Sequence, residues 1–302
     1  MPALGTHVLH SGKCLEKIKP ELEQYGMEVN EGFADFVGAS AIAHDTLALL
    51  LGTGYDRCFV DAHEKNTDAF FLAMIDFIRE NGLRENPDAM AFLYGHIMHY
   101  ALDTQTHPLI YYMSERHPAK YLVSALGAHT LFEAWVDTEK EKEEKAKAEA
   151  VGTVFDSKFP FRKKVSDGTI NALIDAVYEK VHGQKKAAAG YRHGIKIWEF
   201  YQFHMRSAML KHVKAYFPDF SEMLNPRGDS FRNPVSGDDL DATFQQSYDQ
   251  SVDLACELIA AVNANLYHGA GNEDLLKKAF GNSYDTGLPW DDPRPKQYFK
   301  QY

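Results

Sequence analysis

Histidines and carboxylates recur at helical spacing in the segment GHIMHYALDTQTHP, residues 95–108. Four of them would share one stripe of a helix, because they lie at positions i, i+3, i+7 and i+11: His96, His99, Asp103 and His107. His99 and Asp103, four residues apart, would direct two ligand atoms at one point. Pro108 disfavours helical backbone at the residue before it, so we expect the helix to bend or end there and to turn His107 towards a second ion.

A second pair, His129 and Glu133, repeats this i,i+4 spacing on an apolar segment, and Asp137 continues its stripe. Either pair alone occurs by chance in many helices. Together with Asp45 and His63 upstream, the pairs favour metal binding over a purely structural role. Imidazole and carboxylate ligands without thiolates favour zinc. Pairs that converge inside a helical bundle suggest a multinuclear site, in which a bridging carboxylate holds two ions about 3.5 to 4 Å apart.

Helical periodicity dominates the chain, and alternating β-branched runs are nearly absent. We expect helices over 33–52 (interrupted near Gly38 and at 52–54), 66–82, 86–103, 119–150, 169–182, 190–216, 240–266 and 272–280. The Glu and Lys residues at the end of the fourth segment predict a solvated helical face with i,i+4 pairs. Residues 155–168 and 224–239 are rich in turn formers. These features predict a single all-α domain over residues 1–302, built as a bundle of about eight helices.

Composition places the chain among ordinary globular proteins, with 45% hydrophobic and 25% charged residues among 302. The net charge of −11 argues against a broad nucleic-acid footprint and against electrostatic docking on anionic membranes. No apolar run reaches the roughly 18 residues that span a bilayer, and the amino end lacks the features of a secretory signal. Cys14, Cys58 and Cys256 form no CxxC motif and suit a reducing compartment. We therefore expect a cytoplasmic protein without a transmembrane segment.

The motifs resemble those of the bacterial zinc-dependent phospholipase C family, in its intracellular branch. The family pattern H-Y-x-x-D followed by His is similar to HYALDTQTH at 99–107, and the pattern H-x-x-x-E-x-x-x-D is similar to HTLFEAWVD at 129–137. Three further family positions fall, in chain order, on His7, Asp45 and His63. The resemblance is specific from Met1 to about Thr138, and the later segments FRNPVSG and SYDTGLPW resemble the branch more loosely.

The resemblance implies an all-α fold shared with zinc-dependent single-strand nucleases, and a centre of two to three zinc ions. One ion would be held by Asp45, His63, His99 and Asp103. A second would be held by His107, His129 and Glu133, and a third by His7 and the bridging Asp103. The implied reaction is hydrolysis of a phosphodiester by a water whose pKa zinc lowers to near 7. Asp45 and Glu133 would be catalytic as well as ligands, with Asp45 a candidate general base beside that water.

The sequence departs from the family pattern in two ways. Secreted relatives complete the third zinc site with a processed amino-terminal residue. Here Met1, or Pro2 after removal of Met1, either folds into the site or leaves it weak or absent. Three histidines are surplus to the pattern and are candidate substitute ligands: His10, His44 and His96. We expect His96 to orient a ligand from behind and His10 to be an exposed bystander, and His44 fits a functional and a structural role equally well.

We expect the substrate to be a small phosphodiester or a phospholipid head group. A nuclease or nucleotide phosphodiesterase is an alternative that would need aromatic side chains stacking bases near the ions; a nucleic-acid substrate is compatible with the residues but not favoured. A non-catalytic metal-bound module is a second alternative, because a cytoplasmic phospholipase C would threaten the membrane of its own cell. The aromatic segment 191–206 is more typical of core packing than of a cation-binding platform. The oligomeric state does not follow from the sequence.

Overall fold

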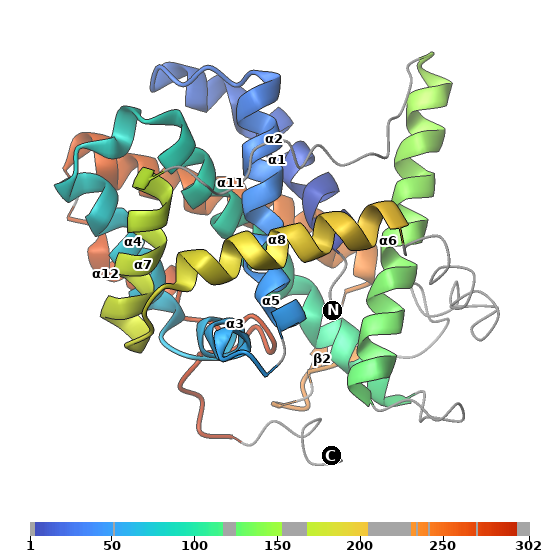
Figure 1. Cartoon of the computed structure of the whole chain (residues 1–302). Helices are drawn as coiled ribbons and strands as arrows, with labels where there is room; N and C mark the ends of the chain where they lie inside the picture. Colours follow the sequence, from blue (N-terminus) through green and yellow to red (C-terminus); the bar gives the residue numbers. More distant parts are fainter. Residues whose placement is uncertain are drawn as a thin grey trace.

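The structure is a computed structural model that describes residues 4–50, 52–116, 125–152, 168–204, 231–233, 235–240, 242–269 and 271–294. Helices make up most of this part of the chain, which confirms the expected all-α class (Figure 1). They are α1 (Leu4–Gln24), α2 (Glu31–Ala43), α3 (Tyr55–Glu64), α4 (Thr67–Glu80), α5 (Pro87–Arg116), α6 (Ala125–Ala150), α7 (Gly168–His182), α8 (Ala187–His204), α11 (Phe244–His268) and α12 (Glu273–Ala279). Two 3-10 helices, η1 (Asp45–Leu50) and η2 (Leu83–Glu85), and the antiparallel strands β1 (Phe231–Arg232) and β2 (Asp239–Leu240) complete the described elements.

Helix α5 runs through the middle of the molecule (Figure 1) and contacts α1, α2, α6 and α11. Every residue from Ala89 to Ala101 is buried. The backbone of α2 approaches α5 closely at Gly95, where a Cβ atom would lie 2.5 Å from the Ser40 Cβ and 2.6 Å from the Val37 carbonyl oxygen. Because Gly95 lacks that atom, Asp45, just after α2, comes to lie beside the ligand stripe of α5.

We expected helix α5 to bend or to end at Pro108. It does not end there, because α5 continues through Pro108 to Arg116. Proline removes the N–H that would bond to the Thr104 carbonyl. Gly287 from a distant loop packs at this point, where a Cβ would lie 2.5 Å from the Thr104 carbonyl oxygen. A tertiary contact therefore covers the backbone position that the proline leaves open, and His107 stays on the α5 stripe.

Other elements agree with the sequence analysis to different degrees. The helices expected over 66–82, 169–182 and 272–280 match α4, α7 and α12 closely. The expected interruption at Gly38 is wrong, because α2 runs through it and packs on Val8 of α1. Helices α1 and α3 were not expected at all. The expected helical residues 119–124 and 205–216, and nearly all of the turn-rich segment 155–168, lie outside the described residues.

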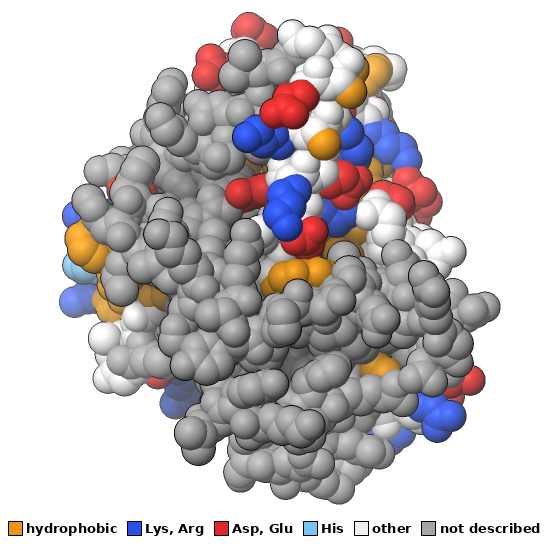
Figure 2. All heavy atoms as spheres, turned by 90° about the vertical axis from the view of Figure 1, so that its right-hand side faces the viewer, with side chains coloured by type: hydrophobic (Ala, Val, Ile, Leu, Met, Phe, Trp, Pro, Cys, Tyr) orange, Lys and Arg blue, Asp and Glu red, His pale blue; other side chains and the backbone are white. Residues whose placement is uncertain are grey.

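The carboxyl-terminal half of α6 presents the predicted solvated face. Figure 2 shows acidic and basic side chains interspersed over the described part of this face. Lys147 bonds to Glu143 at 2.6 Å and to Glu144 at 3.1 Å, four and three residues away. By contrast, two aromatic side chains of the segment 191–206, Tyr191 and Trp198, are buried in the core, whereas Phe200 is exposed. None of the described helices combines the length and the apolar character that a membrane crossing requires.

Candidate metal centre

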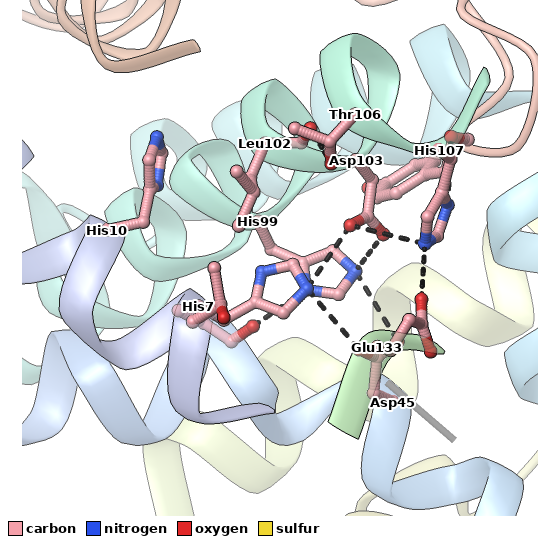
Figure 3. Close-up of polar contacts among 12 residues, drawn as sticks. His7, His10, Asp45, His99, Leu102, Asp103, Thr106, His107 and Glu133 are labelled. Carbon is pink, nitrogen blue, oxygen red and sulfur yellow. Dashed lines mark hydrogen bonds and ion pairs between the residues drawn. The ribbon is translucent and has the colours of Figure 1, made fainter. Parts of the chain in front are cut away.

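The eight predicted ligands meet in one buried cluster, although five separate segments of the chain supply them. Figure 3 shows His7, Asp45, His99, Asp103, His107 and Glu133 of this cluster. Helix α1 brings His7, the start of η1 brings Asp45 and α3 brings His63. Helix α5 supplies His99, Asp103 and His107, and α6 supplies His129 and Glu133. All eight side chains are buried. Two groups have ligand atoms close enough for one ion each: Asp45, His63, His99 and Asp103, and separately His107, His129 and Glu133.

In the first group the two imidazoles face each other. Nε2 of His63 lies 3.0 Å from Asp45 Oδ1, Nε2 of His99 lies 3.0 Å from Asp103 Oδ2, and the two nitrogens are 3.3 Å apart. Each ring donates its Nδ1–H to a backbone carbonyl, at 2.9 Å to Phe59 and at 2.7 Å to Ala41. That bond fixes the tautomer and leaves the Nε2 lone pair directed inwards. Two such lone pairs and two carboxylates at this distance need a proton or a cation between them.

The second group is arranged in the same manner around one carboxylate. Glu133 Oε1 lies 2.9 Å from His129 Nε2 and 3.2 Å from His107 Nε2. His107 donates its Nδ1–H to the Tyr284 carbonyl at 3.2 Å, so that its Nε2 also points into the cluster. The i,i+4 pair on α6 thus converges with the last histidine of the α5 stripe.

Asp103 connects these groups to His7. Its Oδ2 faces His99, while its Oδ1 lies 3.2 Å from His7 Nε2 and 3.7 Å from His107 Nε2. His7 Nε2 is also 3.7 Å from Asp45 Oδ2. The two oxygens of one carboxylate therefore face different sets of nitrogens, which is the arrangement that a bridging ligand needs.

The carboxylates and imidazoles of the cluster shift one another's pKa values. Burial opposes ionisation of Asp103, yet His107 and His99 hold its pKa well below the usual range. The pKa values of Asp45 and Glu133 are likewise lowered by neighbouring imidazoles against the effect of burial. Burial also opposes charge on the imidazoles, yet the carboxylates raise the pKa of His99 to about 9 and that of His107 to about 10. Without a bound ion, protons on these imidazoles balance the carboxylates, and a divalent cation can replace those protons.

The donor set fits zinc. Among the described residues, Asp45 Oδ2 and Glu133 Oε2 are buried carboxylate oxygens without a hydrogen-bond partner, and His129 Nδ1 is a buried nitrogen without one. Leaving ionised oxygens buried and unpaired is costly. Nitrogen and oxygen ligands in groups of three and four match the coordination of zinc. A bound cation would pair with these carboxylate oxygens, and this is the observation that supports a metal site.

The surplus histidines lie behind or beside the cluster. His96 Nε2 lies 3.2 Å from the Tyr191 hydroxyl, which lies 3.1 Å from the Tyr178 hydroxyl, and that hydroxyl lies 3.2 Å from His44 Nε2. The hydrogen bonds of His96 go to Tyr191 and the Phe92 carbonyl rather than to a ligand, so it does not orient one directly. His44 is the member of this hydrogen-bonded series that lies nearest the candidate ligands. The centre of its ring is 4.6 Å from the centre of the His63 ring.

The expectation that His10 is exposed is wrong, because α1 packs on α11 at this position. His10 is completely buried, and its Nε2 lies 2.9 Å from the Ser251 hydroxyl. Figure 3 shows His10 apart from the cluster. The one-turn spacing from His7 to His10 therefore reflects core packing of a helix, not a second ligand.

Asp137 has a positioning role that its stripe alone did not reveal. Its carboxylate accepts hydrogen bonds from the backbone N–H groups of Gly5 at 3.0 Å and Thr6 at 2.7 Å, and from the Thr6 hydroxyl at 2.7 Å. These N–H groups belong to the first turn of α1, where they have no partner within the helix. Asp137 therefore ties the start of α1 to α6 and fixes the helix that carries His7.

The Asp137→Asn substitution is expected to change how stability depends on pH. Burial raises the pKa of Asp137 to about 7, against the lowering effect of hydrogen bonds from Thr6. A folded-state pKa above the ordinary value favours the protonated form, so the stability that this group contributes is lost as pH rises from about 4 through 7. Asparagine does not ionise. Urea unfolding measures the free energy of unfolding of both proteins from pH 5 to pH 8. Relative to the wild type, the variant should gain stability as pH rises, by at most about 1.4 kcal/mol per pH unit. A constant difference across this range would contradict the assignment.

Two residues near the centre were missed by the sequence analysis, Tyr284 and Asp285. The Asp285 carboxylate lies 3.8 Å from His107 Nδ1 and accepts a hydrogen bond from the Tyr111 hydroxyl at 3.2 Å. The only signal for them was the loose resemblance of SYDTGLPW, because nothing in their spacing relates them to residues almost 180 positions earlier.

The fold and the cluster together define an all-α protein with a candidate multinuclear metal centre. Residues 6–187 match the model of the zinc dependent phospholipase C family. The match covers more than half of the chain and all eight predicted ligands, and the protein belongs to this family. The resemblance inferred from the motifs is thereby confirmed, and a zinc-dependent, phospholipase C-like function is supported. No curated protein and no solved structure matches the chain.

Proposed function

We propose that the protein is a zinc-dependent phosphodiester hydrolase of the phospholipase C type. The observation that carries the proposal is the position of Asp103, whose two oxygens face His99 on one side and His7 and His107 on the other. A carboxylate shared in this way holds ions near enough to act on one phosphate. Membership of the family supports the same chemistry.

The ligands divide among two to three ions. Asp45, His63, His99 and Asp103 would hold one ion; His107, His129 and Glu133 would hold a second; His7 and Asp103 would contribute to a third. When bound, zinc supplies Lewis-acid stabilisation of the phosphate oxygens and makes a nearby water acidic enough to act at neutral pH.

The protein's own carboxylates supply the proton acceptors. Asp45 is ionised at neutral pH, because His99 and His63 lower its pKa against burial. Its Oδ1 faces His63, and its Oδ2 has no hydrogen-bond partner among the described residues. Asp45 Oδ2 can therefore accept the proton of an attacking water as a general base. Glu133 Oε2 is a second unpartnered acceptor in the same cluster, and we propose that it, too, participates in the reaction.

The proposed substrate is a small phosphodiester or a phospholipid head group, in line with the family. We propose that the protein acts in the cytoplasm. Its cysteines Cys14, Cys58 and Cys256 are all free, and free thiols persist in a reducing compartment.

Zinc analysis combined with a hydrolysis assay tests the proposal. The purified protein is expected to hold at least two zinc ions per chain and to hydrolyse a soluble phosphocholine ester, and removal of zinc by a chelator should abolish turnover until zinc is restored. Less than one zinc per chain with turnover unaffected by chelation would overturn the proposal. Cleavage of single-stranded DNA without cleavage of the ester would show a nuclease instead, and full occupancy with no turnover on a broad phosphoester panel would show a non-catalytic module.

A further inference from the structure

A loop near the carboxyl terminus, residues 281–290, lies against the metal centre although it falls outside the family match. Tyr284 in this loop donates its backbone N–H to the His63 carbonyl at 3.1 Å and accepts the Nδ1–H of His107 with its own carbonyl at 3.2 Å. Its buried ring lies 4.7 Å from the ring of His63 and 5.4 Å from the ring of His99. One residue of the loop thus contacts ligands of both groups.

The next residue places a carboxylate behind one of these ligands. Asp285 is buried, and its Oδ1 lies 3.8 Å from His107 Nδ1, on the side of the ring opposite to the ligand nitrogen. The hydrogen bond from Tyr111 fixes that oxygen. The Tyr284 carbonyl accepts the Nδ1–H of His107 and orients the ring, and the negative charge of Asp285 behind that N–H makes the other ring nitrogen a stronger donor to a metal.

The loop is held firmly enough to position other groups. Gly287 adopts a left-handed conformation with φ of 64° and sits so close to α5 that a Cβ would lie 2.5 Å from the Thr104 carbonyl oxygen. Asn233, beside β1, donates to the Thr286 carbonyl at 2.8 Å, and Trp290 donates to Asp68 of α4 at 2.9 Å. The loop is therefore fastened to α5, to α4 and to the segment around the two strands.

We propose that residues 281–290 are a positioning element of the metal centre, in which Tyr284 aligns His63 and His107 and Asp285 strengthens the hold of His107 on its ion. The proposal rests on the proposed function only in that the cluster binds zinc. It means that a chain ending with the matched region would lack part of the support of both metal groups. Asp285 is a positioning residue, because it would act through His107.

The Asp285→Asn substitution tests the proposal. Asparagine keeps an acceptor for Tyr111 but removes the negative charge behind His107. Competition with a chromophoric chelator should show that the weakest-bound zinc is held about 10- to 100-fold less tightly, while the unfolding midpoint of the metal-free protein stays unchanged. Asp291→Asn is the matched control, since it makes the same chemical change at an exposed position directly after the loop and should leave zinc affinity unaltered.

A second variant guards against a simple folding defect. Gly287→Ala should displace the loop from α5 and weaken zinc binding in the same assay, with Gly271→Ala, where no atom lies within 4 Å of the added Cβ, as its control. Wild-type zinc affinity in both Asp285→Asn and Gly287→Ala would overturn the proposal while leaving the proposed function intact. If the wild-type protein itself binds no zinc, the proposed function fails instead, and the two failures are distinguishable.

Discussion

Replacing Asp103 with asparagine is expected to reduce the rate of phosphodiester hydrolysis by more than about 100-fold. This loss exceeds the roughly 10- to 100-fold loss that is typical when a residue hydrogen-bonded to a metal ligand is replaced. Asparagine has nearly the same shape, but it carries no charge and has one oxygen where Asp103 uses two. Oδ2 faces His99 and Oδ1 faces His7 and His107, so either orientation of the amide places an NH2 group towards imidazole nitrogens. The zinc content should fall by one or two ions per chain, because the first group and the His7 position share this carboxylate.

The control for this substitution is Asp88→Asn, in the first turn of the same helix and distant in sequence from the ligand stripe. It should retain zinc and turnover, at the cost of a small loss of helix stability of about 0.3 to 1 kcal/mol from the helix dipole. Metal analysis and initial rates on the two variants separate the effects. Full zinc content and near wild-type turnover in Asp103→Asn would show that Asp103 does not bridge ions.

Zinc is expected to stabilise the protein strongly and increasingly as pH rises. At a free zinc concentration 100-fold above Kd, one bound ion contributes about 2.7 kcal/mol, which corresponds to a rise in Tm of about 4 °C for a chain of this size. The ions must displace protons from His99 and His107, whose pKa values the carboxylates raise to about 9 and about 10. Affinity for zinc therefore grows with pH up to those values.

Thermal unfolding of metal-free and zinc-loaded protein at pH 6, 7 and 8 measures this effect. The difference in Tm between the two forms should widen from pH 6 to pH 8. Replacing zinc with magnesium at the same concentration is the control, because imidazole ligands suit magnesium poorly. A Tm that is insensitive to zinc at every pH would show that the buried carboxylates are balanced by protons alone.

The candidate ligands on α5 and α6 were predictable because helical spacing relates them. His99 and Asp103, and likewise His129 and Glu133, lie four residues apart on strongly periodic segments, so the sequence alone predicts that each pair points one way. Which pairs would share an ion was implied by the family resemblance, and the structure brings the candidate ligand atoms together in the same sets. His7 was placed by the resemblance and not by any expected helix.

The two unexpected helices show where local rules end. Helix α1 contains Gly5, Gly12 and Pro20, which lower its intrinsic preference for helix, and α3 has only ten residues between turn formers. Short or poorly propagating helices of this kind are stabilised by packing rather than by propensity. Both lie against the buried core, so the tertiary structure decides their conformation.

The loop at 281–290 and the continuation of α5 through Pro108 were beyond sequence reasoning for the same reason. Gly287 covers the Thr104 carbonyl that Pro108 leaves without its helical partner, and this contact joins residues far apart in the chain. The proposed support of His107 by Asp285 depends on this contact. No local sequence pattern around Thr104 or around Gly287 predicts that these two residues meet.

An anomalous difference map at the zinc absorption edge, from crystals of the zinc-loaded protein, tests the central claim most directly. We expect one peak at the first group, which is formed by Asp45, His63, His99 and Asp103, and a separate peak at the second group, which is formed by His107, His129 and Glu133. If a third peak lies beside His7, Asp103 should contact more than one ion. A map without a peak at either group, from protein soaked in excess zinc at pH 8, would contradict it.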